Sequence, residues 1–262
     1  MVISEPDQDS LVIAGEVIPS RLWMGTSRYP SPEVLVKALE AGRAGLVTVS
    51  VRRLDLKHPE HTFLDLLVGK YRLLPNTAGC YTAEEAIFMA QLAREALETN
   101  WIKLEVIGDD RLLWPDSEEL LRAARALVKE GFVVLAYAPD DPIVCRRLAD
   151  VGCAAVMPLA SPIGSGQGIK DPERLLMIRE LIPERPLVVD AGIGSPADAC
   201  LAMELGYDAV LVNTAIAEAE HPVAMAEAMR EAVDAGRRAH RAGRIPRVSY
   251  ARPSSPKEGL PF

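Results

Sequence analysis

The chain has 262 residues and a formal net charge of −8, and hydrophobic residues make up 49% of it. This composition is typical of a globular protein, and the lack of a long basic run weighs against nucleic acid as a partner. No apolar stretch approaches the roughly 20 residues of a membrane span, and the N-terminus lacks the basic region of a signal peptide. The four cysteines have no CxxC spacing, so we expect a cytoplasmic protein with reduced cysteines and no metal site.

Short apolar runs alternate with longer amphipathic ones along the chain. Eight runs are predicted to be strands, over residues 21–26, 46–51, 71–75, 101–107, 132–138, 154–159, 186–190 and 209–213. Their apolar character is nearly continuous, as in parallel strands that are covered on both faces. Helices are predicted over residues 31–41, 59–69, 82–99, 117–130, 141–151, 171–181, 195–205 and 222–242. Ser31 before a proline, and Thr82 three residues before Glu85, are start signals for two of these helices.

Eight alternating β and α units predict a single (β/α)₈ TIM barrel over residues 1–262. Residues 1–20 are expected to form an N-terminal cap, because residues 11–18 have the pattern of a short strand or hairpin that closes the bottom of the barrel. Residues 244–262 contain four prolines, so this tail is expected to be irregular. The alternative fold is an open doubly wound sheet.

Lys103 is the only one of seven lysines embedded in an apolar run that is predicted to be a buried strand. Burial disfavours the ammonium form, so we expect a lowered pKa, and a neutral amine is a nucleophile for carbonyl groups. Glu105 lies two residues on, on the same face of a strand, and Asp190 ends the seventh strand. These residues predict Schiff-base chemistry with acid/base groups. A purely structural Lys–Glu pair, and an Asp190 that only caps its own turn, are the alternatives.

Three candidate phosphate loops follow successive strands, over residues 163–168, 191–194 and 213–216. Glycines let backbone amides approach an anion, and barrels often place a phosphate behind strands seven and eight. Each loop alone is also typical of an ordinary turn, but the three together predict a phosphorylated ligand. Arg52 and Arg53, after strand two, either bind an anion or form a solvated loop.

In these features the chain resembles bacterial thiazole synthase, the enzyme that builds the thiazole phosphate of thiamine. The resemblance is carried by segments 48–53, 74–79, 82–86, 101–106, 157–159, 162–166, 189–194 and 212–217. It implies a (β/α)₈ barrel in which the lysine at the position of Lys103 condenses with the ketone of 1-deoxy-D-xylulose 5-phosphate. Glu105 and Asp190 match the family's acid/base groups. Its substrate-binding loops match the backbone around Gly164, Ala191, Gly192, Asn213 and Thr214.

The resemblance also implies partners. Sulfur arrives as a thiocarboxylate at the C-terminus of a small ubiquitin-like sulfur-carrier protein, and a dehydroglycine-producing enzyme supplies the remaining C–N unit. The scheme requires no metal or organic cofactor, and the family suggests a homotetramer. The chain departs from the family pattern at Ser27-Arg28, where members carry glycine and lysine, and at Arg252-Pro253, where small residues are usual.

Two other functions are compatible with the same residues. A lysine-dependent aldolase or isomerase of another phosphorylated sugar would form the imine without needing a sulfur carrier. A phosphate-binding or scaffold protein that keeps the fold would bind the ligand without forming an imine. Imine formation and dependence on the carrier therefore distinguish the three functions.

Overall fold

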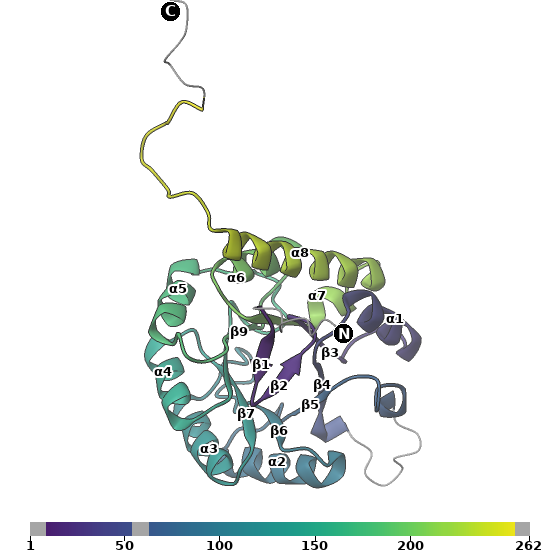
Figure 1. Ribbon diagram of the computed structural model, residues 1–262. Helices are drawn as coiled ribbons and strands as arrows, with labels where there is room; N and C mark the ends of the chain where they lie inside the picture. The colour runs from purple at the N-terminus through teal and green to yellow at the C-terminus, as the bar shows by residue number, and fades with distance from the viewer. Residues whose placement is uncertain (1–8, 54–62, 255–262) are drawn as a thin grey trace, which may run out of the picture.

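The computed structural model describes residues 9–53 and 63–254, and it contains eight parallel strands that alternate with helices (Figure 1). The strands are β3 (Leu22–Gly25), β4 (Val47–Ser50), β5 (Leu73–Asn76), β6 (Trp101–Leu104), β7 (Val133–Ala138), β8 (Ala155–Pro158), β9 (Val188–Asp190) and β10 (Ala209–Val212). They pair in the order β8-β7-β6-β5-β4-β3-β10-β9, and a parallel bridge between Val156 and Leu187 joins the two ends. The sheet is therefore a closed (β/α)₈ barrel, as predicted, rather than an open doubly wound sheet.

Helices surround the barrel, and their first turns follow from the sequence. They are α1 (Pro32–Gly42), α2 (Ala83–Leu97), α3 (Ser117–Lys129), α4 (Pro142–Val151), α5 (Pro172–Leu181), α6 (Pro196–Glu204), α7 (Thr214–Ala217) and α8 (Pro222–Ala242). Ser31 caps α1 before a proline, and Thr82 accepts a hydrogen bond from the Glu85 amide at the start of α2. In a capping box the Glu85 carboxylate would accept a hydrogen bond from the Thr82 amide. Here it accepts one from the preceding amide, that of Tyr81, at 2.8 Å.

Two elements differ from the predicted ones. The short helix α7 lies between β10 and α8, where only a loop was predicted, because four residues are too few to display a helical period. The helix predicted over residues 59–69 falls partly outside the described residues. Within them, Phe63–Leu66 forms a 3₁₀ turn instead of an α-helix.

Alternate residues of each strand face the barrel interior and the surrounding helices. On β3, Leu22 and Met24 pack in the outer core, whereas Trp23 belongs to a separate inner cluster. That inner cluster also contains Leu46, Leu74, Trp101, Leu135, Met157, Val188 and Leu211. The next residues on the same face of β6 and β9 are Lys103 and Asp190. Apolar side chains therefore fill the lower part of the interior, and polar ones are placed nearer the C-terminal ends of the strands.

The N-terminal hairpin closes the bottom of the barrel, as predicted. Its strands, β1 (Leu11–Ile13) and β2 (Glu16–Ile18), are antiparallel, and the connecting Ala14 and Gly15 have φ angles of 49° and 82°. Positive φ at both central residues is the requirement of a type I′ turn. The buried hairpin side chains join the inner cluster, and they are Leu11, Ile13 and Ile18. In Figure 1 the hairpin crosses the centre of the ring of strands and helices.

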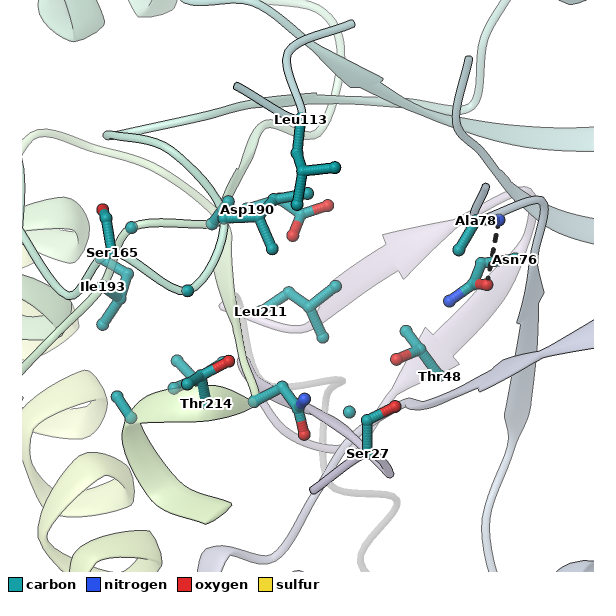
Figure 2. A pocket seen from close by; sticks show the side chains of 18 of the residues that line it. Ser27, Thr48, Asn76, Ala78, Leu113, Ser165, Asp190, Ile193, Leu211 and Thr214 are labelled. Carbon is teal, nitrogen blue, oxygen red and sulfur yellow. Dashed lines mark hydrogen bonds between the residues drawn. The ribbon is translucent and has the colours of Figure 1, made fainter. Parts of the chain in front are cut away.

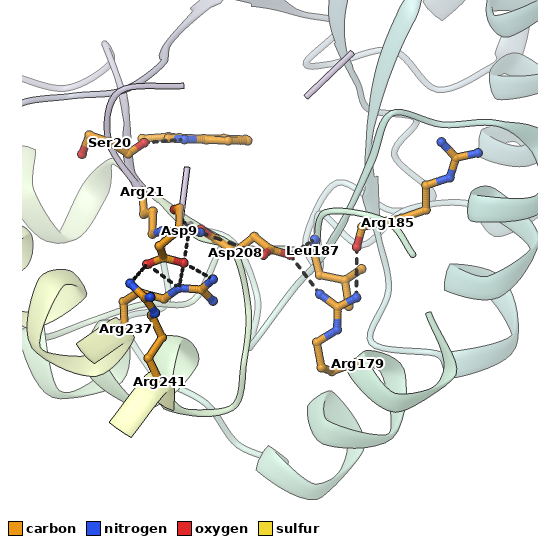
Figure 3. Close-up of polar contacts among 10 residues, drawn as sticks. Asp9, Ser20, Arg21, Arg179, Arg185, Leu187, Asp208, Arg237 and Arg241 are labelled. Carbon is orange, nitrogen blue, oxygen red and sulfur yellow. Dashed lines mark hydrogen bonds and ion pairs between the residues drawn. The ribbon is translucent and has the colours of Figure 1, made fainter. Parts of the chain in front are cut away.

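A network of ion pairs attaches the segment before the hairpin to the rest of the barrel (Figure 3). Asp9 pairs with Arg237 of α8 at 2.6 Å and with Arg21, just before β3, at 3.0 Å. Arg21 also donates to the Asp208 carbonyl at 2.7 Å, and the Asp208 carboxylate pairs with Arg179 of α5 at 2.9 Å. Because these side chains are largely buried, the network joins the N-terminal segment, β3, α5 and α8 in one layer.

Beyond α8, residues 243–254 are irregular and exposed, and they lead away from the barrel (Figure 1). This agrees with the predicted tail, whose last residues, 255–262, lie outside the described ones. Among the helices of the described ranges, none has both the length and the apolar character needed to cross a bilayer.

Candidate active site

A cavity of about 600 Å³ opens at the C-terminal ends of the barrel strands, where (β/α)₈ enzymes place their active sites. The predicted site residues all line it, and they are Lys103, Glu105, Gly164, Asp190, Ala191, Gly192, Asn213 and Thr214. Figure 2 shows Ser165 and Thr214 on one side of the cavity and Thr48 and Asn76 on the other. The Asp190 carboxylate reaches into the space between them.

Lys103 lies between two carboxylates at the buried end of this cavity. Its Nζ atom is 2.7 Å from Asp190 Oδ2 and 3.1 Å from Glu105 Oε1. All three side chains are at most 8% exposed. Glu105 follows Lys103 closely in the chain, whereas Asp190 comes from β9. Closure of the barrel therefore brings the second carboxylate to the lysine. When all three groups are ionised, the cluster has one positive and two negative charges.

Thr77 holds the backbone of Glu105 in place. Strand β6 ends at Leu104, earlier than the predicted end at Ile107, so Glu105 lies beyond the strand ladder. Thr77 Oγ1 accepts a hydrogen bond from the Glu105 amide and donates one to the Glu105 carbonyl, both at 2.8 Å. The Thr77 amide also donates to the Lys103 carbonyl at 3.2 Å. This fully buried threonine replaces the missing strand partner and keeps Glu105 beside the amine.

The predicted lowering of the Lys103 pKa is wrong in the free protein. Burial does lower the pKa of Lys103, but the charges of Asp190 and Glu105 more than offset this effect and raise the pKa above the ordinary lysine value. Burial raises the pKa of Asp190 to about 6, with the Lys103 charge opposing this rise and the Glu105 charge adding to it. Lys103 is therefore a cation before substrate binds.

The loops after β8, β9 and β10, which were predicted to bind a phosphate, have unusual backbone angles and line the cavity. Gly164 and Gly192 have φ angles of 72° and 84°, and Ala191 has a φ of 83°, which alanine rarely adopts. Such strain is typical of functional sites. Within the described ranges, the backbone amides of Gly192, Thr214 and Ala215 donate no hydrogen bond. Unpaired amides that line a cavity are the donors that a phosphate requires.

Replacing Gly192 with alanine tests the prediction that this loop binds an anion. A Cβ atom there would lie 2.1 Å from Ser161 Oγ and 2.5 Å from the Ser161 amide nitrogen. We expect the free energy of unfolding to fall by about 3 kcal/mol, from the backbone strain and the clash together. Binding of inorganic phosphate or a sugar phosphate should weaken at least about tenfold, since each lost charged hydrogen bond costs roughly 1.5–3 kcal/mol.

The matched control is Gly15→Ala in the hairpin turn, where φ is 82° but a Cβ atom would meet nothing within 4 Å. Urea denaturation and titration with inorganic phosphate would measure both variants. Equal losses of stability in Gly192→Ala and Gly15→Ala, with unchanged phosphate binding, would contradict the assignment of this loop.

Asn213 fixes the loop after β3 rather than reaching into the cavity with its amide. With the amide oriented as a donor, Asn213 Nδ2 bonds the Ser27 carbonyl at 3.0 Å and the Gly25 carbonyl at 3.3 Å. In the same loop Arg28 has a φ of 70° and pairs with Glu218 at 2.8 Å on the exposed rim. Arg28, which stands where family members carry lysine, thus forms a surface ion pair.

Arg52 lies near the rim of the cavity, with its side chain half-exposed. Its guanidinium is 4.0 Å from both Glu85 Oε2 and Cys80 Sγ. The Arg53 side chain lies outside the described part of the chain. Anion binding by the two arginines therefore stays a prediction.

Two residues beside Lys103 were not among the predicted site residues. The ring centroid of Tyr137 is 5.5 Å from Lys103 Nζ, and Thr77 clamps Glu105. Tyr137 had a local signal, because it is a polar aromatic residue near the C-terminal end of an apolar strand. The sequence signal for Thr77 was ambiguous. Its hydrogen-bond partner, Glu105, is distant in the chain, and the loop that contains Thr77 is also typical of a structural turn.

Comparisons with known proteins identify the family. The family described as Thiazole biosynthesis protein ThiG matches residues 12–256. A thiazole synthase of Geobacter sulfurreducens is 56% identical over 254 residues, which cover 96% of this chain and 97% of the relative. A thiazole synthase of Methylobacterium sp. is also 56% identical, over 256 residues that cover 97% of this chain and 96% of the relative.

A solved structure is similar over nearly the whole chain as well. The crystal structure of the Amycolatopsis orientalis BexX/CysO complex contains a chain that superposes with a TM-score of 0.81 and 34% identity. The match covers 93% of this chain and 100% of that one. With a barrel whose cavity contains the lysine, the two carboxylates and the glycine loops, the chain belongs to the ThiG family and is a thiazole synthase of thiamine biosynthesis.

Proposed function

We propose that the enzyme condenses 1-deoxy-D-xylulose 5-phosphate, dehydroglycine and carrier-bound sulfur through an imine at Lys103. The observation that carries this proposal is the buried Lys103 Nζ between Asp190 and Glu105, in a cavity that also offers unpaired backbone amides. A sugar phosphate has a ketone for the amine and an anion for the amides. The arrangement thus suits both ends of the proposed substrate.

Imine formation requires a proton to leave Lys103 first, because its ammonium form has no lone pair for attack. Asp190 is the proposed acceptor, since it lies 2.7 Å from Nζ and burial raises its pKa to about 6. The neutral amine adds to the ketone carbon and passes a second proton to the ketone oxygen. Protonated Asp190 returns its proton to the same oxygen, which leaves as water, and an iminium with one N–H bond remains.

The iminium is an electron sink that acidifies the neighbouring carbon of the sugar. Glu105, 3.1 Å from Nζ, is the proposed base that removes this proton. The rigid Thr77 clamp supports the role, because a general base must be held within reach of the carbon acid. Gly164, Ala191, Gly192, Asn213 and Thr214 form the proposed phosphate-binding loops.

The proposed sulfur donor is a small ubiquitin-like carrier protein with a C-terminal thiocarboxylate, and the proposed source of dehydroglycine is a separate enzyme. The solved BexX/CysO complex supports a protein partner, because a relative of 34% identity is bound there to a second protein. The cavity opens at one end of the barrel, so an extended carrier tail could enter from that side.

The test combines adduct trapping with sulfur transfer. The wild-type protein is incubated with 1-deoxy-D-xylulose 5-phosphate and borohydride, and the adduct is mapped by peptide mass spectrometry. We expect a single adduct on Lys103. Product formation is then followed with a carrier that ends in a thiocarboxylate and with the same carrier ending in a carboxylate. Lack of an adduct on protein that binds the sugar phosphate refutes the imine, and equal product with both carriers refutes the sulfur route.

A further inference from the structure

Tyr137 presents its ring to the proposed nucleophile. It is a fully buried residue near the end of β7, on the same inward face as Leu135. The ring centroid is 5.5 Å from Lys103 Nζ, which is within the range of cation–π attraction. The titratable side chains that face the amine are thus Glu105 from its own segment, Asp190 from β9 and Tyr137 from β7.

The hydroxyl of Tyr137 anchors the ring. It donates to the carbonyl of Leu113 at 3.3 Å, in the loop between β6 and α3. Leu113 has a φ of 53°, lines the cavity, and is held by a hydrogen bond from its amide to the Asp109 carbonyl at 2.8 Å (Figure 2). The ring orientation is therefore fixed from both sides, by the strand below and by this loop above.

The ring differs from the two carboxylates in one respect that matters for an imine. Asp190 changes its charge during imine formation, because it is neutral while it holds the proton from Lys103 and ionised again once that proton has left with water. Burial, together with the charges of Asp190 and Glu105, raises the pKa of Tyr137, so its hydroxyl stays neutral. The negative face of the ring attracts a cation in every protonation state of the carboxylates.

We propose that Tyr137 is a further catalytic residue, whose ring face stabilises the positive charge on Lys103 Nζ in both the ammonium and the iminium. The iminium part of this role rests on the proposed imine. The alternative is that Tyr137 only fills the apolar cluster that it forms with Ile107 and Leu159. A filling role depends on ring shape, whereas charge stabilisation depends on the electron density of the ring.

The test varies electron density at constant shape. Three proteins are compared with the wild type: Tyr137→Phe, the same variant with a trifluorinated phenyl ring at position 137, and Tyr137→Leu. Each is incubated with 1-deoxy-D-xylulose 5-phosphate and cyanoborohydride, which reduces iminium ions, and the adduct at Lys103 is measured against pH. Removing stabilisation of a cation lowers its pKa, so the whole trapping profile should move to lower pH.

We expect Tyr137→Phe to keep the wild-type profile, because it keeps the ring face. The fluorinated ring and Tyr137→Leu should move the profile down by roughly half to one pH unit, which lies within the range of cation–π interactions. If the adduct decreases in amount while its pH profile stays in place for the fluorinated ring, the role of Tyr137 is packing and the inference is wrong. The fluorinated variant still distinguishes packing from charge stabilisation even if Tyr137→Leu does not fold.

A second measurement separates this inference from the proposed function. If the wild type forms no adduct at all, the imine itself is refuted, and the ammonium can still be probed without substrate. At a fixed pH below the Lys103 pKa, the rate of labelling by an amine-reactive reagent follows the neutral fraction. A Lys103 pKa that is lower by about half to one unit raises the neutral fraction roughly three- to tenfold. Labelling of the fluorinated variant that is faster than that of Tyr137→Phe by this factor would support the ring–cation interaction. Equal rates would overturn it.

Discussion

Replacing Lys103 with alanine is expected to abolish the trapped adduct and to lower turnover at least about a thousandfold, because the proposed nucleophile is lost. The same change leaves Glu105 and Asp190 as two buried carboxylates without their shared cation. We therefore expect the free energy of unfolding at pH 7 to fall by about 3–5 kcal/mol. Part of this loss should be recovered in acid, where the carboxylates become protonated. Peptide mass mapping, steady-state rates and urea denaturation at two pH values measure these effects.

Lys103→Arg is the control that separates the nucleophile from the charge. A guanidinium stays protonated and forms no imine with a ketone, but it can pair with both carboxylates. This variant should therefore be as inactive as Lys103→Ala while losing less stability at pH 7. Turnover of Lys103→Arg within tenfold of the wild type would show that Lys103 acts through its charge, and the Schiff base would have to be abandoned.

Replacing Asp190 with asparagine is expected to lower turnover by about a hundred- to ten-thousandfold, the usual contribution of a positioned acid/base group. The amide is nearly the same size as the carboxylic acid but accepts no proton from Lys103. Trapping of the imine should be slow yet detectable, because the amine is still present. A turnover within a few-fold of the wild type would assign proton transfer to another group.

The stability of Asp190→Asn should also differ from that of the wild type in its pH dependence. Asp190 has a pKa of about 6 in the folded protein, above the ordinary value of 3.8. Between these values the folded state binds more protons than the unfolded state, so the free energy of unfolding falls as the pH rises. Asparagine does not titrate. The stability of the variant relative to the wild type should therefore increase across this window, by about 3 kcal/mol, and stay constant above it.

Glu105→Gln provides the matched comparison for this pH dependence. The charge of Glu105 is one of the causes that raise the Asp190 pKa, so removing it should move the upper end of the window to lower pH. Thermal unfolding followed between pH 4 and pH 8 would measure all three proteins. A wild-type stability that increases steadily from pH 4 to pH 6 relative to Asp190→Asn would contradict a raised Asp190 pKa.

Local patterns in the sequence account for most of the elements. The runs predicted as strands form the eight barrel strands, because a continuous apolar stretch needs cover on both faces wherever it folds. The cap residues Ser31 and Thr82 start their helices as predicted, because a capping bond involves only neighbouring residues. The end of β6 was less predictable. An apolar run continues to Ile107, but the strand ladder stops at Leu104 because the neighbouring partner is the Thr77 side chain.

The sequence by itself determined the fold, the family and the identity of an unusual buried lysine, because strand and helix periods, caps and motif spacing are properties of neighbouring residues. Only the tertiary structure decided the electrostatics of that lysine. Closure of the barrel places Asp190 at 2.7 Å from Lys103 Nζ and the Tyr137 ring at 5.5 Å, and no local pattern encodes either distance. The pKa of Lys103 is consequently raised rather than lowered. The sign of a pKa shift in a buried cluster depends on the sum of all nearby charges, and folding brings those charges together.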